Sequence, residues 1–478
     1  MDIKISLPSV LALFFCVFFL SSCSQNRKSD VKWISTTPSQ PWQVQKNFKT
    51  CSTSQNIFTL DTSKTQQTID GFGACFNELG WTSLSALSRK DRNEILKELF
   101  EPGAGANFNI CRMPLGANDF SRDWYSYNEQ DGDFKMENFS IQNDLETLIP
   151  FIKSAQAYNA DLKIWASPWS PPAWMKYNDH YACATSGEDL AEKYSNDLPP
   201  ERQGKEGTNM FIQEPRYFEA YALYFAKFIE AYREQNIDIY MVMPQNEFNS
   251  CQIFPSCTWT AEGLAEFIGG YLGPKMNEIG VDVMMGTMER PDASLIDPVL
   301  LHPSASQYIK GVGFQWAGKN AVPEVNEKYE DLKLYQTEQE CGDGKNDWEH
   351  CLHAWDLMKH YLHNGINAYM YWNMSLKKGG YSRWGWQQNS LVTINPEDKT
   401  YHFNHEYYLM KHVSRFVKPG AKKIDTDKDV LAFLNPDKSV VAVYYNDDVT
   451  EKEYTFKVKQ KSVSAKLKPK SFNTLIIK

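Results

Sequence analysis

Two glutamates stand out because each comes at the end of a short apolar run that is typical of a β-strand. Glu247 follows residues 239–244 (IYMVMP), and Glu338 follows residues 332–337 (LKLYQT). In an α/β barrel, the carboxyl ends of the strands carry the residues that meet the substrate. Hydrolysis of a glycosidic bond needs two carboxyl groups, one that donates a proton and one that attacks the sugar or activates water. The pair therefore favours glycosidic chemistry.

The neighbours of these two glutamates refine the prediction. Asn246 precedes Glu247 and can hydrogen-bond the sugar hydroxyl next to the reacting carbon. The second acid has two candidates, because Glu340 lies two residues after Glu338 and side chains two apart on an extended segment share a face. We favour Glu338 as the nucleophile because it sits at the strand tip, with Glu340 as the alternative.

Arg112 and Asp119 add polar groups near a second predicted strand end. Arg112 closes the strand expected at residues 107–113, where a permanently charged guanidinium needs a partner, and a carboxylate at the barrel mouth is the natural one. Asp119 could accept hydrogen bonds from sugar hydroxyls, or it could cap a turn.

Three tryptophans also lie at predicted strand ends. Trp169 belongs to the proline-rich loop 167–174, and Trp316 and Trp372 end two later strands. Prolines restrict the backbone of the loop, so it suits a rigid stacking platform for sugar rings. We expect these tryptophans to form walls of the site; packing in the core is the alternative for each.

The elements that must position these residues form a repeating pattern. Short β-type runs alternate with amphipathic helical segments, which is the signature of parallel βα units. The expected strands are Thr68–Gly73, Asn107–Met113, Asp161–Ser167, Asp238–Pro244, Val281–Thr287, Val312–Trp316, Leu332–Thr337 and Ala368–Asn373. The expected helices include Arg92–Phe100, Asp144–Tyr158, Tyr217–Glu234, Ala261–Ile279 and Trp348–Asn364. The fold class is therefore α/β, a (β/α)8 TIM barrel over residues 66–417.

The end of the chain follows a different pattern. Residues 418–478 contain short alternating strands separated by Asn/Asp-rich turns, which predicts a β-sandwich. The β-like residues 41–65 are expected to add N-terminal strands to this sandwich. We expect it to brace the barrel, although a separate sugar-binding role is possible.

The N-terminus reads as a targeting segment. Lys4 precedes an apolar run, residues 7–20, that is too short to span a bilayer as a mature helix, and the following Ser21-Ser22-Cys23 completes a pattern that resembles a bacterial lipobox. We therefore expect a lipoprotein signal peptide at residues 1–22, acylation of Cys23 and a flexible tether over residues 23–40. The enzyme would be an exported, membrane-anchored bacterial lipoprotein of the periplasm or cell surface.

Composition limits the partners. The formal charge of −9 argues against a nucleic-acid partner, and the 14% aromatic content suits either a large core or a carbohydrate site.

Export of the protein would permit disulfide bonds. Cys251 with Cys257, and Cys341 with Cys351, could each close a small loop, with free buried thiols as the alternative.

At these residues the chain resembles glycoside hydrolase family 30, which includes glucosylceramidases and endo-β-1,6-glucanases. The matching segments, in chain order, are 69–73 (IDGFG), 109–114 (NICRMP), 119–121 (DFS), 166–176 (ASPWSPPAWMK), 245–247 (QNE), 336–338 (QTE), 371–373 (YWN) and 412–420 (HVSRFVKPG). The resemblance implies that Glu247 is the acid/base and Glu338 the nucleophile. It also implies a sugar subsite formed by Arg112, Asp119, Trp169, Asn246, Trp316 and Trp372.

Three positions depart from the family pattern. Phe248 follows the acid where proline is common, Gln315 precedes Trp316 where histidine is frequent, and Glu340 is an additional acid beside Glu338. These changes leave both carboxyl groups in place but make the leaving-group side of the site harder to predict.

We therefore predict a retaining β-glycosidase without cofactor or metal. β-1,6-Glucan is the first substrate candidate, ahead of β-glucosides, glucosylceramide-like lipids and β-xylosides, and the insertion 179–213 is expected to shape the cleft. The main rival is a non-catalytic glycan-binding lipoprotein. A metallohydrolase that uses the pairs His350/His353, His360/His363 or His402/His405 is a weaker rival, because histidine pairs on helices are usually surface or packing residues.

Overall fold

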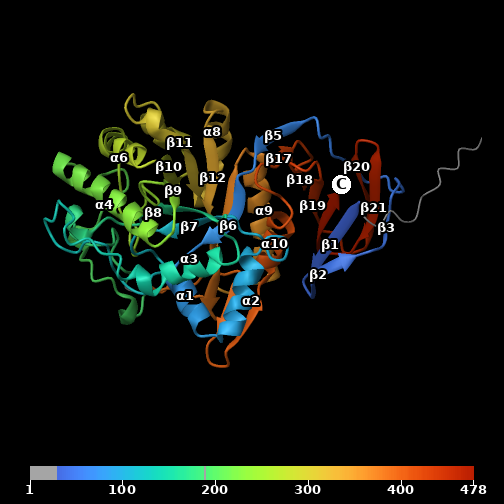
Figure 1. The fold of residues 1–478 in the computed structure, drawn as a ribbon, viewed down its shortest axis with the longest axis horizontal. Helices are drawn as coiled ribbons and strands as arrows, with labels where there is room; N and C mark the ends of the chain where they lie inside the picture. The colour runs from blue at the N-terminus through green and yellow to red at the C-terminus, as the bar shows by residue number, and fades with distance from the viewer. Residues whose placement is uncertain (1–29, 188–189) are drawn as a thin grey trace, which may run out of the picture.

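The computed structural model describes residues 30–187 and 190–478 and places a closed eight-stranded barrel at the centre of the larger domain (Figure 1). The strands are all parallel and close in the order β10-β11-β12-β13-β6-β7-β8-β9. They are β6 Gly71–Cys75, β7 Ile110–Pro114, β8 Lys163–Ser167, β9 Ile239–Val242, β10 Asp282–Met288, β11 Ile309–Gln315, β12 Lys333–Glu338 and β13 Ala368–Asn373. All eight predicted strands are confirmed, with their ends shifted by a few residues.

The interior of the barrel is filled by side chains, as expected for this fold. A separate apolar cluster inside the strand ring contains Ile110, Trp165, Met241, Met243, Met284, Tyr335, Ala368 and Met370. Every residue of β7 and β13 is buried, because parallel strands are covered on both faces. This packing holds the strand ends in fixed positions.

Helices surround the barrel and cover its outer face (Figure 1). They are α1 Glu78–Ser85, α2 Arg89–Phe100, α3 Leu148–Gln156, α4 Pro215–Glu234, α5 Ala261–Phe267, α6 Gly273–Glu278, α7 Asp297–Leu300, α8 Val322–Lys328, α9 Trp348–His363 and α10 His405–Ser414. The sequence accounts for their starts: the side chains of Ser88 and Asp347 cap α2 and α9, and Pro215 occupies the first position of α4.

One predicted helix is divided. Residues 261–279 form α5 and α6 joined by a π-helical turn, Ile268–Leu272. Pro274, near the start of α6, has no N–H to donate, which favours an irregular hydrogen-bond ladder before it. Among the described residues, no helix is long and apolar enough to cross a membrane.

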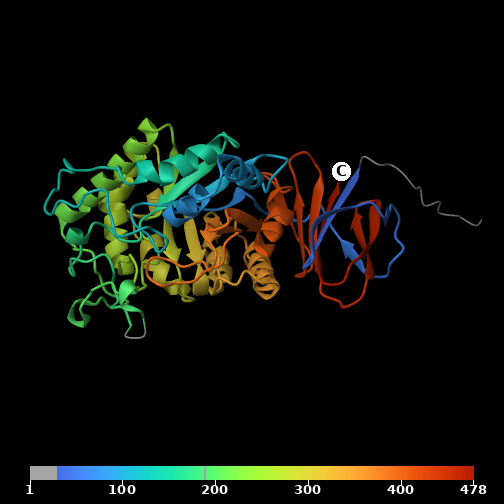
Figure 2. The same cartoon turned by 90° about the horizontal axis from the view of Figure 1, so that it is seen from below.

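The smaller domain is a β-sandwich beside the barrel (Figure 2). One sheet has the order β2-β1-β22-β19-β18-β17-β5 and the other β3-β21-β20-β4. The N-terminal strands are β1 Val31–Thr37, β2 Gln40–Gln45, β3 Phe48–Lys49, β4 Ile57–Thr59 and β5 Thr65–Thr68. The C-terminal strands are β17 Lys422–Ile424, β18 Val430–Leu434, β19 Val440–Asn446, β20 Lys452–Val458, β21 Lys461–Leu467 and β22 Ser471–Ile477. Both ends of the chain therefore build the sandwich, as predicted.

The expected tether over residues 23–40 is wrong for its second half. Val31–Thr37 is strand β1, which pairs along its length with β22, and the side chains of Trp33 and Ile34 are buried. Trp33 and Ile34 are adjacent and point to opposite faces of the sheet, so both faces of β1 are covered at this point. The rest of that prediction, including Cys23, lies outside the described residues.

His412 on α10 joins the two domains. Its Nδ1 lies 2.7 Å from Thr474 Oγ1 on β22, and its Nε2 lies 2.8 Å from Thr36 Oγ1 on β1. Burial lowers the pKa of His412 to about 3, so the ring is neutral and one nitrogen donates while the other accepts. The sandwich is thus bonded to a helix of the barrel.

The proposed disulfide partners stay apart as thiols. Cys251, Cys257, Cys341 and Cys351 are all free cysteines. The alternative of free thiols therefore describes these four residues.

Candidate active site

Glu247 and Glu338 face the same amide. Nε2 of Gln315, at the end of β11, lies 3.0 Å from Glu247 Oε1 and 3.3 Å from Glu338 Oε2. The two oxygens can be no further apart than the sum of those distances, which is below the about 6.5 Å at which the spacing of inverting glycosidases begins. Gln315 is oriented for this role because its Oε1 accepts a hydrogen bond from Thr337 Oγ1 at 2.9 Å.

Arg112 contacts Glu338 and is fully buried. Its Nη1 is 3.1 Å from Glu338 Oε2, and its Nη2 donates to Asn246 Oδ1 at 2.6 Å and to Ser167 Oγ at 2.9 Å. The planar guanidinium therefore connects the ends of β7, β8 and β12 with the loop after β9. The predicted carboxylate partner of Arg112 is Glu338.

Burial raises the pKa of both Glu247 and Glu338, because a charged carboxylate loses the solvation of water. Two close acids share protons as a pair. The charge is better placed on Glu338, which has the Arg112 ion pair and accepts a hydrogen bond from Trp316 Nε1 at 3.0 Å. No cation of the part of the chain that the structure describes forms an ion pair with Glu247, which accepts hydrogen bonds from the neutral amides of Gln315 and Gln252. The proton of the pair therefore belongs on Glu247.

Glu340 is engaged elsewhere. Its Oε1 forms an ion pair with Lys319 Nζ at 2.6 Å, and its Oε2 lies 2.9 Å from His353 Nε2. These contacts lower the pKa of Glu340 against the effect of its partial burial. The geometry favours Glu338 over Glu340 as the partner of Glu247.

The backbone at Glu247 is held in an uncommon conformation. Its φ is 48°, in the left-handed region that non-glycine residues seldom occupy. Thr287 Oγ1, on β10, accepts a hydrogen bond from the Glu247 N–H at 2.9 Å and donates to Asn246 Oδ1 at 3.2 Å. Such strained positions concentrate at functional sites, where the surroundings fix them.

A hollow of about 480 Å³ opens above the pair. It is lined by Asp119, Trp169, Asn246, Glu247, Gln252, Phe254, Glu289, Arg290, Trp316, Ala317, Lys319, Glu338, Glu340, Trp386 and Gln388. Six of the eight residues predicted for the site line it. Asp119 is buried, and none of the described residues donates a hydrogen bond to its Oδ1, an arrangement that suits an acceptor for a sugar hydroxyl.

The other two predicted residues lie behind this wall. Arg112 contacts Glu338, and its Cζ is 4.3 Å from the centre of the Trp169 ring. Trp372 is fully buried and stacks on Trp169 with ring centres 5.3 Å apart. Trp372 therefore supports a wall residue, while Trp316 is partly exposed at the mouth.

Several lining residues were not identified from the sequence. Glu289 and Arg290 follow β10, whose end had no predicted site residue. Their position directly after a barrel strand is the feature by which the sequence could have identified them as site residues. Phe254 follows the acid in the chain, and Trp386 follows the last barrel strand; their rings are 5.8 Å apart.

The insertion 179–213 shapes the catalytic hollow only indirectly. Among its described residues, none lines the hollow. Instead, it packs behind the loop that follows Glu247: the Gly207 N–H donates to Asn249 Oδ1 at 2.6 Å, and Ala182 forms a β-bridge with Pro255. It supports Gln252 and Phe254 from behind.

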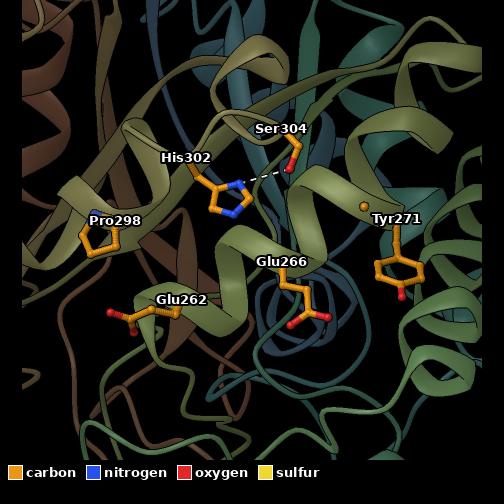
Figure 3. A pocket seen from close by; sticks show the side chains of 7 residues that line it. Glu262, Glu266, Tyr271, Pro298, His302 and Ser304 are labelled. Atoms are coloured by element: carbon orange, nitrogen blue, oxygen red, sulfur yellow. Dashed lines mark hydrogen bonds between the residues drawn. The ribbon is translucent and has the colours of Figure 1, made fainter.

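A second hollow, of about 600 Å³, lies on the outside of the barrel (Figure 3). It is lined by Glu262, Glu266, Gly270, Tyr271, Pro298, His302 and Ser304. These residues come from the outer helical layer and the loop after α7, and not from strand ends. It contains none of the residues predicted for catalysis.

The histidine pairs have other contacts. His350 Nε2 lies 3.1 Å from the Glu340 carbonyl, and His360 Nε2 lies 2.8 Å from the Lys319 carbonyl. Among the described residues, no group of three or more His, Cys, Asp or Glu side chains is placed to hold a metal ion.

Known proteins share both domains. The model of the glycosyl hydrolase family 30 TIM-barrel domain matches residues 69–195 and 201–417, and that of the family 30 β-sandwich domain matches residues 420–475. Putative glucosylceramidase 1 of Caenorhabditis elegans is 30% identical over 417 residues, which is 81% of this chain and 75% of the relative.

Two further relatives act on a different class of substrate, by their names. Endo-1,6-beta-D-glucanase neg1 of Aspergillus fumigatus is 28% identical, covering 80% of this chain and 79% of its own length. The solved structure of an endo-beta1,6-glucanase superposes with a TM-score of 0.79 and 26% identity, covering 94% of this chain and 99% of that one. On the family match and the shared architecture, the chain belongs to glycosyl hydrolase family 30 and is a glycoside hydrolase.

Proposed function

We propose that this glycosidase hydrolyses β-linked glucosyl substrates with retention of configuration, and that β-1,6-glucan is its substrate. A carboxylate oxygen of Glu338 attacks the anomeric carbon while Glu247 gives its proton to the departing oxygen. Glu247, now ionised, then takes a proton from water, which attacks the same carbon and releases the sugar from Glu338.

The observation that carries this mechanism is the contact of one amide, Gln315 Nε2, with both carboxyl groups. The limit it sets on the separation of these two oxygens is compatible with direct attack by Glu338, as in a retaining mechanism. Arg112 beside Glu338 supplies the charge difference that the two roles need.

Support for the substrate comes from the relatives and from the site. The relatives include endo-1,6-beta-glucanases and glucosylceramidases, which share a β-linked glucosyl unit. The partly exposed ring of Trp386 and the polar groups at the mouth suit a sugar on the leaving-group side. We therefore place β-1,6-glucan ahead of glucosylceramide-like lipids, β-glucosides and β-xylosides.

A product profile tests the proposal. The protein is incubated separately with β-1,6-glucan, an aryl β-glucoside, an aryl β-xyloside and glucosylceramide, and the anomer released first is identified by NMR. We expect β-1,6-glucan to be cleaved fastest, with the β-anomer appearing first. Release of the α-anomer would overturn the mechanism. Correctly folded protein that cleaves none of the four would support the rival, a glycan-binding lipoprotein.

We also propose export and lipid anchoring at Cys23. The support is the sequence alone: Lys4, the apolar run 7–20 and the lipobox-like residues before Cys23. Labelling of cells with a fatty-acid analogue should mark the wild-type protein and leave Cys23→Ala unmarked. Equal labelling of both would contradict it.

A further inference from the structure

Glu289 is a third carboxyl group in the catalytic hollow, and the mechanism above does not use it. It follows directly after β10 and is 2% exposed, yet among the described residues no other residue donates a hydrogen bond to its carboxyl oxygens. The nearest cation is Nη1 of Arg290, at 3.8 Å from Oε1, while Nη2 of Arg290 is paired with Glu206. A buried carboxyl without a hydrogen bond is costly and needs an explanation.

The strand order of the barrel shows on which side of the acid Glu289 lies. Glu247 comes after β9, Glu289 follows the neighbouring strand β10, and Asp119 follows β7, two strands away from β9 in the other direction. Glu289 and Asp119 line the hollow that contains the catalytic pair, so around this hollow Glu247 lies between them. Asp119 is the residue expected to bind the sugar that becomes attached to Glu338, which leaves the side of Glu289 for the departing group.

The protonation of Glu289 suits a partner with hydroxyl groups. Burial, together with the negative charge of Glu247, raises the pKa of Glu289 to about 8. At neutral pH its carboxyl is mostly protonated, so it can donate one hydrogen bond and accept another. Neighbouring hydroxyls of a sugar offer this donor and acceptor together, whereas the apolar chains of a lipid alcohol offer neither.

We propose that Glu289 holds hydroxyl groups of the leaving-group sugar and thereby selects a saccharide over a lipid or aryl leaving group. This inference rests on the proposed function and deepens it by assigning the far side of the same site. Glu289 contacts substrate in this role but takes no part in bond cleavage. Arg290 positions Glu289 and is itself fixed by Glu206 of the insertion, which gives residues 179–213 an indirect influence on the leaving group.

The test compares two leaving groups in Glu289→Ala and Glu289→Gln. We measure kcat/KM for a β-1,6-linked gluco-oligosaccharide and for 4-nitrophenyl β-glucoside, whose leaving group has no sugar hydroxyls. Loss of two hydrogen bonds should lower the oligosaccharide-to-aryl ratio about 10–100-fold in Glu289→Ala. Glu289→Gln, whose amide also donates and accepts, should keep the ratio within about 5-fold of wild type. Equal losses on both substrates in Glu289→Ala would overturn the proposal.

Glu406→Gln provides a matched control. Glu406 is also a buried carboxyl whose pKa burial raises, but it lies on α10 and does not line the hollow. Its substitution should leave the ratio unchanged. If Glu289→Ala does not fold, as judged by thermal unfolding, Glu289→Asp replaces it, because the shorter side chain withdraws the carboxyl from the sugar and should lower the ratio.

A second readout separates this inference from the choice of substrate. With the aryl glucoside as donor, glucose or methanol is added as acceptor, and transfer products are counted against hydrolysis. Glu289→Ala should lose transfer to glucose about 10-fold more than transfer to methanol, whatever linkage the wild type prefers. If wild type does not cleave β-1,6-linked substrates, but Glu289→Ala still loses more transfer to glucose than to methanol, the substrate proposal is wrong and the role of Glu289 stands. Equal loss with both acceptors would overturn the role.

Discussion

Replacing Arg112 by methionine tests the electrostatic basis of the site. The substitution keeps an unbranched side chain of similar length but removes the charge that contacts Glu338 at 3.1 Å. Two unit charges centred about 4 Å apart interact by about 4 kcal/mol at an effective dielectric constant of about 20. Each 1.4 kcal/mol is about tenfold in an equilibrium. The ionised fraction of Glu338 should therefore fall by about 1000-fold at mildly acidic pH.

The sign of the pH effect follows from this loss. Without the guanidinium the pKa of Glu338 rises, and because attack needs the ionised form, the acidic limb of the activity profile moves to higher pH. We expect kcat/KM for an aryl β-glucoside to fall by about 1000-fold at mildly acidic pH and to recover partly as the pH increases. The assay is a pH profile of wild type, Arg112→Met and Arg112→Lys.

Arg112→Lys is the matched control because it keeps the charge but loses the planar fork. It should restore much of the acidic limb while leaving Asn246 and Ser167 without one of their donors. Folding is checked by thermal unfolding, since removing one partner of a buried pair can cost about 3–5 kcal/mol. A folded Arg112→Met with an unshifted profile and activity within tenfold of wild type would refute the reasoning.

Glu247→Ala should lower kcat by about 100–10,000-fold, and added azide should restore turnover of an activated aryl β-glucoside and yield the β-glucosyl azide; absence of the azide product would contradict an acid/base role. Trp33→Ala should lower the free energy of unfolding by about 3–5 kcal/mol, because the ring is buried in the sandwich core and its Nε1 donates to Asn473; a loss below about 0.5 kcal/mol in denaturant titration would favour a flexible tether there. Glu340→Gln should shift the unfolding midpoint downwards through its lost pairing with Lys319 and His353 and should reduce activity far less than Glu338→Gln; equal loss of activity in the two variants would reopen the choice of nucleophile.

The barrel could be predicted because its strands and helices are each recognisable from a short stretch of sequence. Segments such as 368–373 are continuous apolar β-formers, and the helices between them carry apolar stripes, so both patterns are visible in short windows. The same logic placed Glu247, Glu338 and Arg112 at one edge, since the carboxyl ends of parallel strands meet there. Strand β1 was missed because its pairing with β22 joins opposite ends of the chain, and the polar residues before it suggested a tether.

The remaining parts of the site depend on three-dimensional contacts that no spacing reveals. Gln315 gains its role from the distance to two carboxyl groups contributed by other strands. Trp372 resembles a wall residue by position but is covered by Trp169. Glu289 follows a barrel strand and could have been a candidate by position, but only the fold shows that it is buried and that, among the described residues, no other residue donates a hydrogen bond to its carboxyl group.

The most direct test of the central claim is to trap the glycosyl-enzyme. The protein is treated with an activated 2-deoxy-2-fluoro-β-glucoside, which slows release from the nucleophile, and the labelled peptide is sequenced by mass spectrometry. We expect one sugar per protein, attached to the side chain of Glu338 and absent in Glu338→Gln. A label on Glu340 or Glu247, or inhibition without any covalent label, would contradict the mechanism.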